Sequence, residues 1–273
     1  MSRSPLTTIC RCAFAAALFA IAMTTPASMT SAADGCPTSA DEISTDRPDV
    51  TNSSVVVPYG SLQAENGVDW TVRQGSNVVS GSETRLRLGV ARCTEVIADV
   101  PTYFYSLNGR ASSGFSDFVV SIKRELPVPF GFQLSATGGL GFPTGANKIS
   151  SHGYDPYVQF PWSHRLTGDW SLHGMFTVTW FTRQHAIDPT FEPTLSLERE
   201  FGPTRDLFFE YVGEYPNHAR PSQILDGGGS WRVTKVQQLD FHAGFGLNSN
   251  SPDHFFGIGY SFRLDRLFTG SRN

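Results

Sequence analysis

The stretch 170-WSLHGMFTVTW-180 decides the fold. Every second residue from Trp170 to Trp180 is apolar or glycine, and the residues between them are polar except for Met175. A period of two is typical of a β-strand with one apolar and one polar face. The run is about twice the usual length of a strand in a soluble sheet, but it is as long as a tilted strand that crosses a bilayer. The sequence therefore predicts a membrane-spanning strand here.

The same alternation recurs on both sides of this stretch. It appears at residues 62–72, 83–90, 118–123, 130–142, 158–163, 194–198, 207–214, 238–247 and 256–262, and more weakly at 96–105 and 225–233. Aromatic residues lie near the ends of many of these runs, where the strands of membrane barrels carry girdles of aromatic residues at the membrane interface. We therefore expect an all-β fold, a closed antiparallel up-and-down transmembrane β-barrel of about 12 strands. Because lipid offers no partner to an open sheet edge, the last strand should pair with the first.

The connections between these runs alternate in length, starting with a long one. Short connections are expected at residues 92–94, 127–129, 166–169 and 202–205, and longer ones at 106–116, 143–154, 183–189 and 215–222. Outer-membrane barrels have short periplasmic turns and longer outside loops. The alternation thus places both chain termini in the periplasm, requires an even number of strands and favours a membrane barrel over a soluble secreted β-domain.

The chain divides into four parts. Residues 1–33 have the order of a cleaved secretory signal peptide: Arg3 and Arg11 precede an apolar run at 13–23, and small residues follow. Residues 34–60 form a polar N-terminal segment in the periplasm, residues 61–264 the barrel in the bacterial outer membrane, and residues 265–273 a tail. After cleavage Cys36 and Cys93 remain, and they either form a disulfide or stay unpaired.

Composition and motifs argue against several classes of function. A formal net charge of -4 and a pI of about 6.0 argue against a nucleic-acid partner. The sequence has no HExxH and no GxSxG motif, so we expect no metal, no cofactor and no catalytic residues. We expect no enzyme but a barrel whose partners are the lipid bilayer, the outer-membrane assembly machinery and a small-molecule solute.

The polar faces of the strands should line the lumen. The charged residues expected there are Glu65, Asp69, Glu83, Arg85, Arg87, Lys123, Arg165, His173, Glu198, Glu210, Arg232, Asp240 and His242. Two interpretations stay open. Rings of opposite charge can orient a small polar or aromatic solute, or the charges pair with one another and only fill and hydrate the lumen.

The N-terminal segment carries an acid-base box, Thr45 to Asp49 (TDRPD). We expect Asp46, Arg47 and Asp49 to cap the periplasmic mouth through an Asp–Arg pair that Pro48 fixes. The alternative is a plug or a contact with a partner.

Several stretches resemble one family of outer-membrane proteins. They are ISTDRPDVTNSSVVVPYGSLQAENGVDW (43–70), GFSDFVVSIKREL (114–126), GLGFPTG (139–145), YDPYVQFPWSHRLTGDWSLHG (154–174) and FFGIGYSF (255–262). Together they resemble transporters of the phenol-degradation MetA-pathway type, and the resemblance covers most of the mature chain. It implies a barrel for uptake or efflux of small, often aromatic, compounds. Such barrels usually end on an aromatic residue, so either Phe262 is an internal assembly signal or the tail folds back.

The sequence thus predicts a porin-like barrel for passive or coupled passage of small, including aromatic, molecules. A non-conducting structural or adhesive surface barrel is the alternative from a different class, and a soluble secreted β-domain is another.

Overall fold

The computed structural model describes residues 41–183 and 186–268, so the predicted signal peptide lies outside it. Within these described ranges the chain forms fourteen strands. They are β1 (Leu62–Arg73), β2 (Ser76–Ala91), β3 (Thr94–Asp99), β4 (Tyr103–Ser106), β5 (Gly114–Phe115), β6 (Phe118–Leu126), β7 (Phe132–Phe142), β8 (Asp155–Arg165), β9 (Trp170–Arg183), β10 (Ala186–Glu200), β11 (Arg205–Pro216), β12 (Ser222–Thr234), β13 (Gln237–Gly246) and β14 (His254–Leu264). Within the described ranges there is no helix of the length and apolarity needed to cross a membrane.

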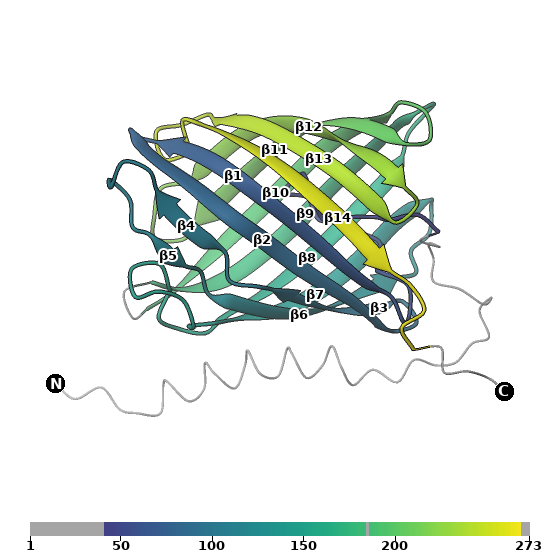
Figure 1. Cartoon of the computed structure of the whole chain (residues 1–273), viewed down its shortest axis with the longest axis horizontal. Helices are drawn as coiled ribbons and strands as arrows, with labels where there is room; N and C mark the ends of the chain where they lie inside the picture. The colour runs from purple at the N-terminus through teal and green to yellow at the C-terminus, as the bar shows by residue number, and fades with distance from the viewer. Residues whose placement is uncertain (1–40, 184–185, 269–273) are drawn as a thin grey trace. The chain divides into compact units, whose positions relative to one another are not determined.

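Twelve of these strands close into a ring of antiparallel pairs (Figure 1). The closure joins β1 to β14 along eleven residue pairs, from Leu62 opposite Leu264 to Val72 opposite His254. The short strands β4 and β5 extend the wall beside β2. The predicted 12-strand barrel is therefore confirmed, and so is the pairing of the last strand with the first. We call the end at Leu62 and Leu264 the terminal end and the opposite end the loop end.

The two faces of the wall differ in polarity, and β13 shows this clearly. Its Leu239 and Phe241 are exposed on the outside, whereas Asp240 and His242 are buried on the inside. Ile258 on β14 is likewise 53% exposed. A soluble protein buries its apolar side chains, but here the apolar face points outward. This arrangement suits a wall that lipid surrounds, with a polar lumen inside.

The connections agree with the prediction at one end of the barrel but not fully at the other. At the terminal end they are short, with residues 92–93, 127–131, 166–169, 201–204 and 235–236 between strands. At the loop end the first connection, expected to be long, is only Gln74 and Gly75, both with positive φ, as tight hairpin turns require. The expected loop at 183–189 belongs to β9 and β10 apart from residues 184–185, which lie outside the described ranges.

The sequence predicted only residues 83–90 of β2, and an irregularity in the strand explains why its first half was missed. The β1–β2 register shifts between Glu65 and Gly67, opposite Ser82–Arg85, and Glu83 has a φ of 38°. A bulge of this kind inserts a residue and breaks the period of two. The alternation is therefore lost although the strand continues.

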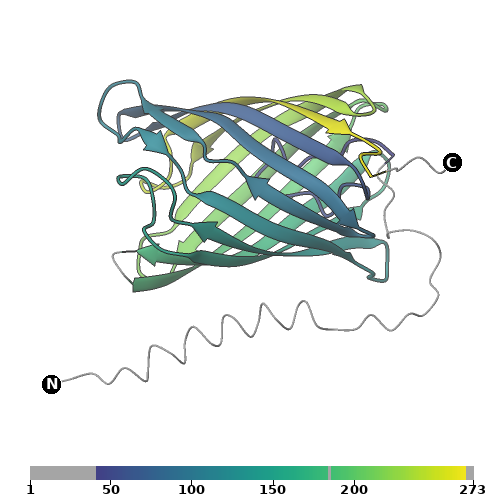
Figure 2. The same cartoon turned by 60° about the horizontal axis from the view of Figure 1, so that its bottom comes forward.

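Residues 41–60 lie inside the ring, toward its terminal end (Figure 2). They contain neither helix nor strand. The described part of the tail, residues 265–268, folds back beside Gly60. The Leu267 amide donates to the Gly60 carbonyl at 2.7 Å, and the Phe268 ring packs against Tyr59 with centroids 5.8 Å apart.

The inverted polarity of the wall predicts where a charge is not tolerated. Ile258→Arg places a cation at the middle of the lipid-facing side of β14 and should lower the free energy of unfolding by about 2–4 kcal/mol. Urea titration of the protein in lipid vesicles, followed by tryptophan fluorescence, measures the change. The matched control, Leu107→Arg in the loop-end connection, should cost less than about 1 kcal/mol. Equal losses in both variants would contradict the assignment of the outer face.

Candidate functional site

The backbone of residues 41–60 is held by carboxylates of the barrel wall. A segment without regular structure must find other acceptors for its buried amides. Glu65 accepts from the Asp46 amide at 2.9 Å, and Glu210 accepts from the Val50 and Thr51 amides at 2.7 and 2.8 Å. Glu125 and Glu95 accept from the Val56 and Val57 amides at 2.8 and 2.6 Å. Because these carboxylates stand on β1, β11, β6 and β3, the segment is fixed to the wall on several sides.

Asp46 occupies the centre of a cationic cluster. Its carboxylate lies 3.1 Å from Arg85, 3.3 Å from Arg87 and 3.2 Å from Lys123. Burial alone would raise the pKa of Asp46, but Arg87, Lys123 and Arg85 outweigh it and hold the pKa well below its ordinary value. Asp46 is therefore an anion at any physiological pH.

The wall supplies further anions to the same cations. Arg87, whose side chain is fully buried, also contacts Glu65 and Glu95 at 2.9 Å each. The Arg87 guanidinium donates to the Val55 carbonyl at 2.8 Å as well. The basic part of the lumen on β2 and β6 is thus neutralised by the wall and the segment together.

Arg47 points to the other side of the segment. It lies 2.8 Å from Glu83, 3.5 Å from Asp240 and 3.8 Å from Asp69. Its guanidinium passes over Gly67 and Gly259, which stand opposite each other on β1 and β14. A Cβ at either position would come within 2.3–2.7 Å of the guanidinium, so a larger residue at either position would displace the Arg47 side chain.

These contacts correct the expected cap. The internal Asp–Arg pair is not formed, because Asp46 and Arg47 each pair with the wall instead. The box lies among the strands rather than across the mouth. The carbonyl of Pro48, expected only to stiffen the box, accepts a hydrogen bond from His242 at 2.8 Å.

Among the residues that the structure describes, Asp49 takes part in no ion pair. Burial raises its pKa well above the ordinary value, and Glu210, Glu198 and Asp226 raise it further. The side of the lumen that Asp49 faces is therefore acidic, in contrast to the side that Asp46 faces.

Neutral contacts complete the docking of the segment. The hydroxyl groups of Ser54 and Ser163 on β8 lie 2.9 Å apart, and the Asn52 amide donates to Gln159 at 3.1 Å. Thr51 bonds to Thr194 on β10. Residues 50–57 thus touch both β8 and β10, across the ring from β1 and β2.

The predicted lumen residues fall into two groups. Eleven lie at the segment or in the ion pairs around it: Glu65, Asp69, Glu83, Arg85, Arg87, Lys123, Glu198, Glu210, Arg232, Asp240 and His242. Arg232 contacts the segment at Glu42, 3.3 Å away. The other two lie nearer the terminal end: Arg165 is 69% exposed and pairs with Glu200, and His173 lies 3.7 Å from Glu198.

Other residues of the site escaped the sequence reading. Glu95 and Glu125 accept segment amides, and Gly67 and Gly259 make room for Arg47. Glu95 lies at the start of the short strand β3, whose weak alternation did not show that its side chain points into the lumen. The glycines did leave a signal, since a glycine inside a strand often marks a close backbone approach.

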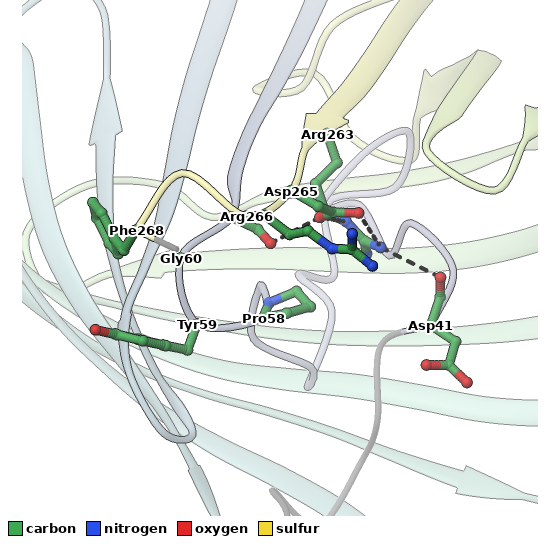
Figure 3. A pocket seen from close by; sticks show the side chains of 9 residues that line it. Asp41, Pro58, Tyr59, Gly60, Arg263, Asp265, Arg266 and Phe268 are labelled. Carbon is green, nitrogen blue, oxygen red and sulfur yellow. Dashed lines mark hydrogen bonds and ion pairs between the residues drawn. The ribbon is translucent and has the colours of Figure 1, made fainter. Parts of the chain in front are cut away.

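A cavity of about 350 Å³ opens where the segment leaves the lumen (Figure 3). Its lining combines the exit of the segment with the tail. Asp265 accepts from Ser61 and from Arg263 at 2.8 Å each. Burial would raise the pKa of Asp265, but these two partners lower it below its ordinary value.

Of the two cysteines expected in the mature chain, Cys93 lies among the described residues. Cys93 is disulfide-bonded, whereas Cys36 lies outside the described residues. The pairing of Cys36 with Cys93 stays a prediction.

A closed antiparallel barrel with an apolar outer face and a charged lumen defines a porin-like transmembrane protein. The sequence matches the family described as "Putative MetA-pathway of phenol degradation" over residues 45–264, and the chain belongs to this family. The predicted family is thereby confirmed. A comparison with curated proteins finds no match.

Two solved structures illustrate the shared fold. The NanC porin, in a rhombohedral crystal form, is 10% identical and has a TM-score of 0.55, with 74% of this chain and 100% of that chain covered. The KdgM porin in complex with disordered oligogalacturonate is 8% identical and has a TM-score of 0.52, with 74% and 98% covered. At these identities the likeness concerns the fold.

The Asp46 cluster predicts how firmly the segment is held. Asp46→Asn removes the anion that Arg85, Arg87 and Lys123 share and should lower the free energy of unfolding by about 3–5 kcal/mol, because buried cations lose their partner. Hydrogen exchange at the Val56 and Val57 amides should become faster at the same time. Asp253→Asn, an equal change of charge in a loop-end connection, should leave both quantities unchanged. Wild-type exchange in the Asp46 variant would show that the cluster does not hold the segment.

Asp49 predicts a dependence on pH. Its raised pKa means that its contribution to stability is present below the ordinary aspartate pKa and is lost as the pH rises through the raised value. Asp49→Asn should therefore stabilise the fold, by an amount that grows as the pH rises above the ordinary aspartate pKa of about 4. The measured quantity is the difference in unfolding free energy between the two proteins, since His242 and the other titrating neighbours are common to both. A difference that does not vary with pH would contradict this assignment.

Proposed function

We propose that the protein is an outer-membrane channel for small molecules and that residues 41–60 are its gate. The observation that carries the proposal is the inner face of the barrel, where the closed wall turns polar and charged side chains inward. Such a lumen accommodates water and polar solutes that the lipid excludes. A ring of twelve strands lies between barrels filled by side chains and wide aqueous channels, so the passage is narrow.

The known relatives support transport of small solutes. The NanC and KdgM proteins are porins, and one KdgM structure contains oligogalacturonate. The family description names phenol degradation, which favours small aromatic compounds as the cargo. The longer connections at one end support an orientation with the terminal end in the periplasm. The cleaved signal peptide and the assembly machinery belong to the same proposal.

The segment supports gating because its contacts are reversible. It is held by hydrogen bonds and ion pairs rather than by strand pairing. At the terminal end it joins β1 through Tyr59 and Gly60, and Gly60 has a φ of 74°. A turn at this glycine gives the segment a fixed base about which to leave the lumen.

A disulfide that locks the segment tests the gate. The Ser54 and Ser163 hydroxyls are 2.9 Å apart, which brings their Cβ atoms near the separation of about 3.5–4.5 Å that a disulfide needs. The double variant Ser54→Cys/Ser163→Cys should conduct less than the wild type in planar bilayers and recover when a reductant is added. Swelling of liposomes in small sugars and phenols provides a second measurement.

The controls separate the lock from other effects of cysteine. The single variants Ser54→Cys and Ser163→Cys should behave as wild type, and reductant on the wild type accounts for the disulfide of Cys93. Absence of conductance and swelling in every protein would refute the channel and favour a non-conducting structural or adhesive surface barrel. Conductance that the lock leaves unchanged would retain the channel and refute the gate.

A further inference from the structure

One side of the lumen carries a strip of carboxylates. The acidic strip comprises Glu192 and Glu198 on β10, Glu210 and Glu214 on β11 and Asp226 on β12. Glu210 stands opposite both Ser196 and Asp226, so the three side chains share the inner face. Glu192 alternates with Phe191, which is 43% exposed on the outer face. Glu214 lies near the loop end and Glu198 nearer the terminal end, so the strip follows the length of the barrel.

Among the described residues, ion pairs reach the strip only at its two ends, at Glu214 and Glu198. Arg183 reaches Glu214 at 3.5 Å, and His173 reaches Glu198 at 3.7 Å. Across the described ranges, Glu192, Glu210 and Asp226 take part in no ion pair. The segment adds Asp49 to the same side, with Glu210, Glu198 and Asp226 as its charged neighbours. A second imidazole, that of His242, is held by Asp69 at 3.4 Å and by the Pro48 carbonyl.

The cations of the opposite wall do not compensate for the strip. Arg85, Arg87 and Lys123 each contact one or more of Asp46, Glu65, Glu95 and Asp99 within 3.7 Å. The charge of these three cations is therefore balanced by carboxylates of the segment and of their own side of the wall. A solute that passes along β10–β12 therefore meets mainly negative charge.

Asp226 points most directly to a ligand. Its side chain is only 4% exposed, and its Oδ1 atom has no hydrogen-bond partner among the described residues. A buried carboxylate oxygen without a partner is costly, and a cationic group in the lumen would satisfy it. In the part of the chain that the structure describes, no three His, Cys, Asp or Glu side chains are arranged to hold a metal ion. A hydrated alkali cation or an organic ammonium group fits better than a chelated metal.

We propose that the acidic strip makes the passage selective for cationic over anionic solutes. The inference rests on the proposed channel and adds its specificity. Fixed charges that line a pore attract ions of the opposite sign and exclude those of the same sign. Among aromatic solutes, benzylamine should pass most readily, benzyl alcohol should be tolerated and benzoate should be excluded.

Reversal potentials in planar bilayers test the sign of the selectivity. With a potassium chloride gradient across the wild-type protein, the permeability ratio of potassium to chloride should exceed one. The double variant Glu192→Gln/Asp226→Asn should lower this ratio by about fivefold or more, since each unit charge near the path contributes on that scale. Neither side chain holds the segment, so the gate contacts remain intact.

Asp169→Asn is the matched control, because Asp169 is exposed in the turn between β8 and β9, outside the strip. Its permeability ratio should equal that of the wild type. Liposome swelling in benzylamine and benzoate should show the same order, with the preference reduced only in the double variant. Current with a ratio at or below one, or a ratio that the double variant leaves unchanged, would overturn the inference. Absence of current in all three proteins would instead refute the proposed channel.

Discussion

The pairing of every backbone amide and carbonyl in the spanning wall is the constraint on which the rest of the structure depends. Lipid provides no hydrogen-bond partner, so the strands must close on themselves. The chain meets this demand by pairing β1 with both β2 and β14. Closure fixes the alternation of faces, because each residue that points away from lipid must point into the lumen. Polar side chains consequently gather where a soluble protein would have its core.

A lumen filled with charges has an energetic cost, because its ions are partly removed from water. The N-terminal segment reduces this cost on the basic side of the lumen. Buried ions are costly unless they are paired and hydrogen-bonded. Arg87 alone has three carboxylates within 3.3 Å: Asp46, Glu65 and Glu95. Only Asp46 comes from the segment, but it is also the anion that Lys123 and Arg85 share. Asp46 thus supplies the basic wall with an anion that the wall itself lacks, and these ion pairs fix where the segment binds.

The sequence alone predicted the wall well, because alternation is a local property that a few neighbouring residues express. Eleven of the thirteen predicted lumen charges lie in or near the segment contacts. Pairing is a different matter, since it depends on how the segment threads the ring. Thr51 and Glu210 are 159 positions apart in the chain, and no local pattern reports such a contact. The β2 bulge was hidden for the same reason. Gly67 and Gly259 did mark a close approach, but no local pattern shows that Arg47 makes it.

The asymmetry of the lumen is the last consequence of this arrangement. The segment carries three charged residues, Asp46, Arg47 and Asp49. Asp46 pairs with the basic wall, and Arg47 pairs with Glu83, Asp69 and Asp240. Asp49 then faces Glu210 and Asp226 without a cation. The docked segment is therefore attracted by one side of the ring and repelled by the other. A cation that enters on the acidic side relieves this repulsion without breaking the ion pairs at Asp46, so the occupancy of the acidic side sets how firmly the segment is held.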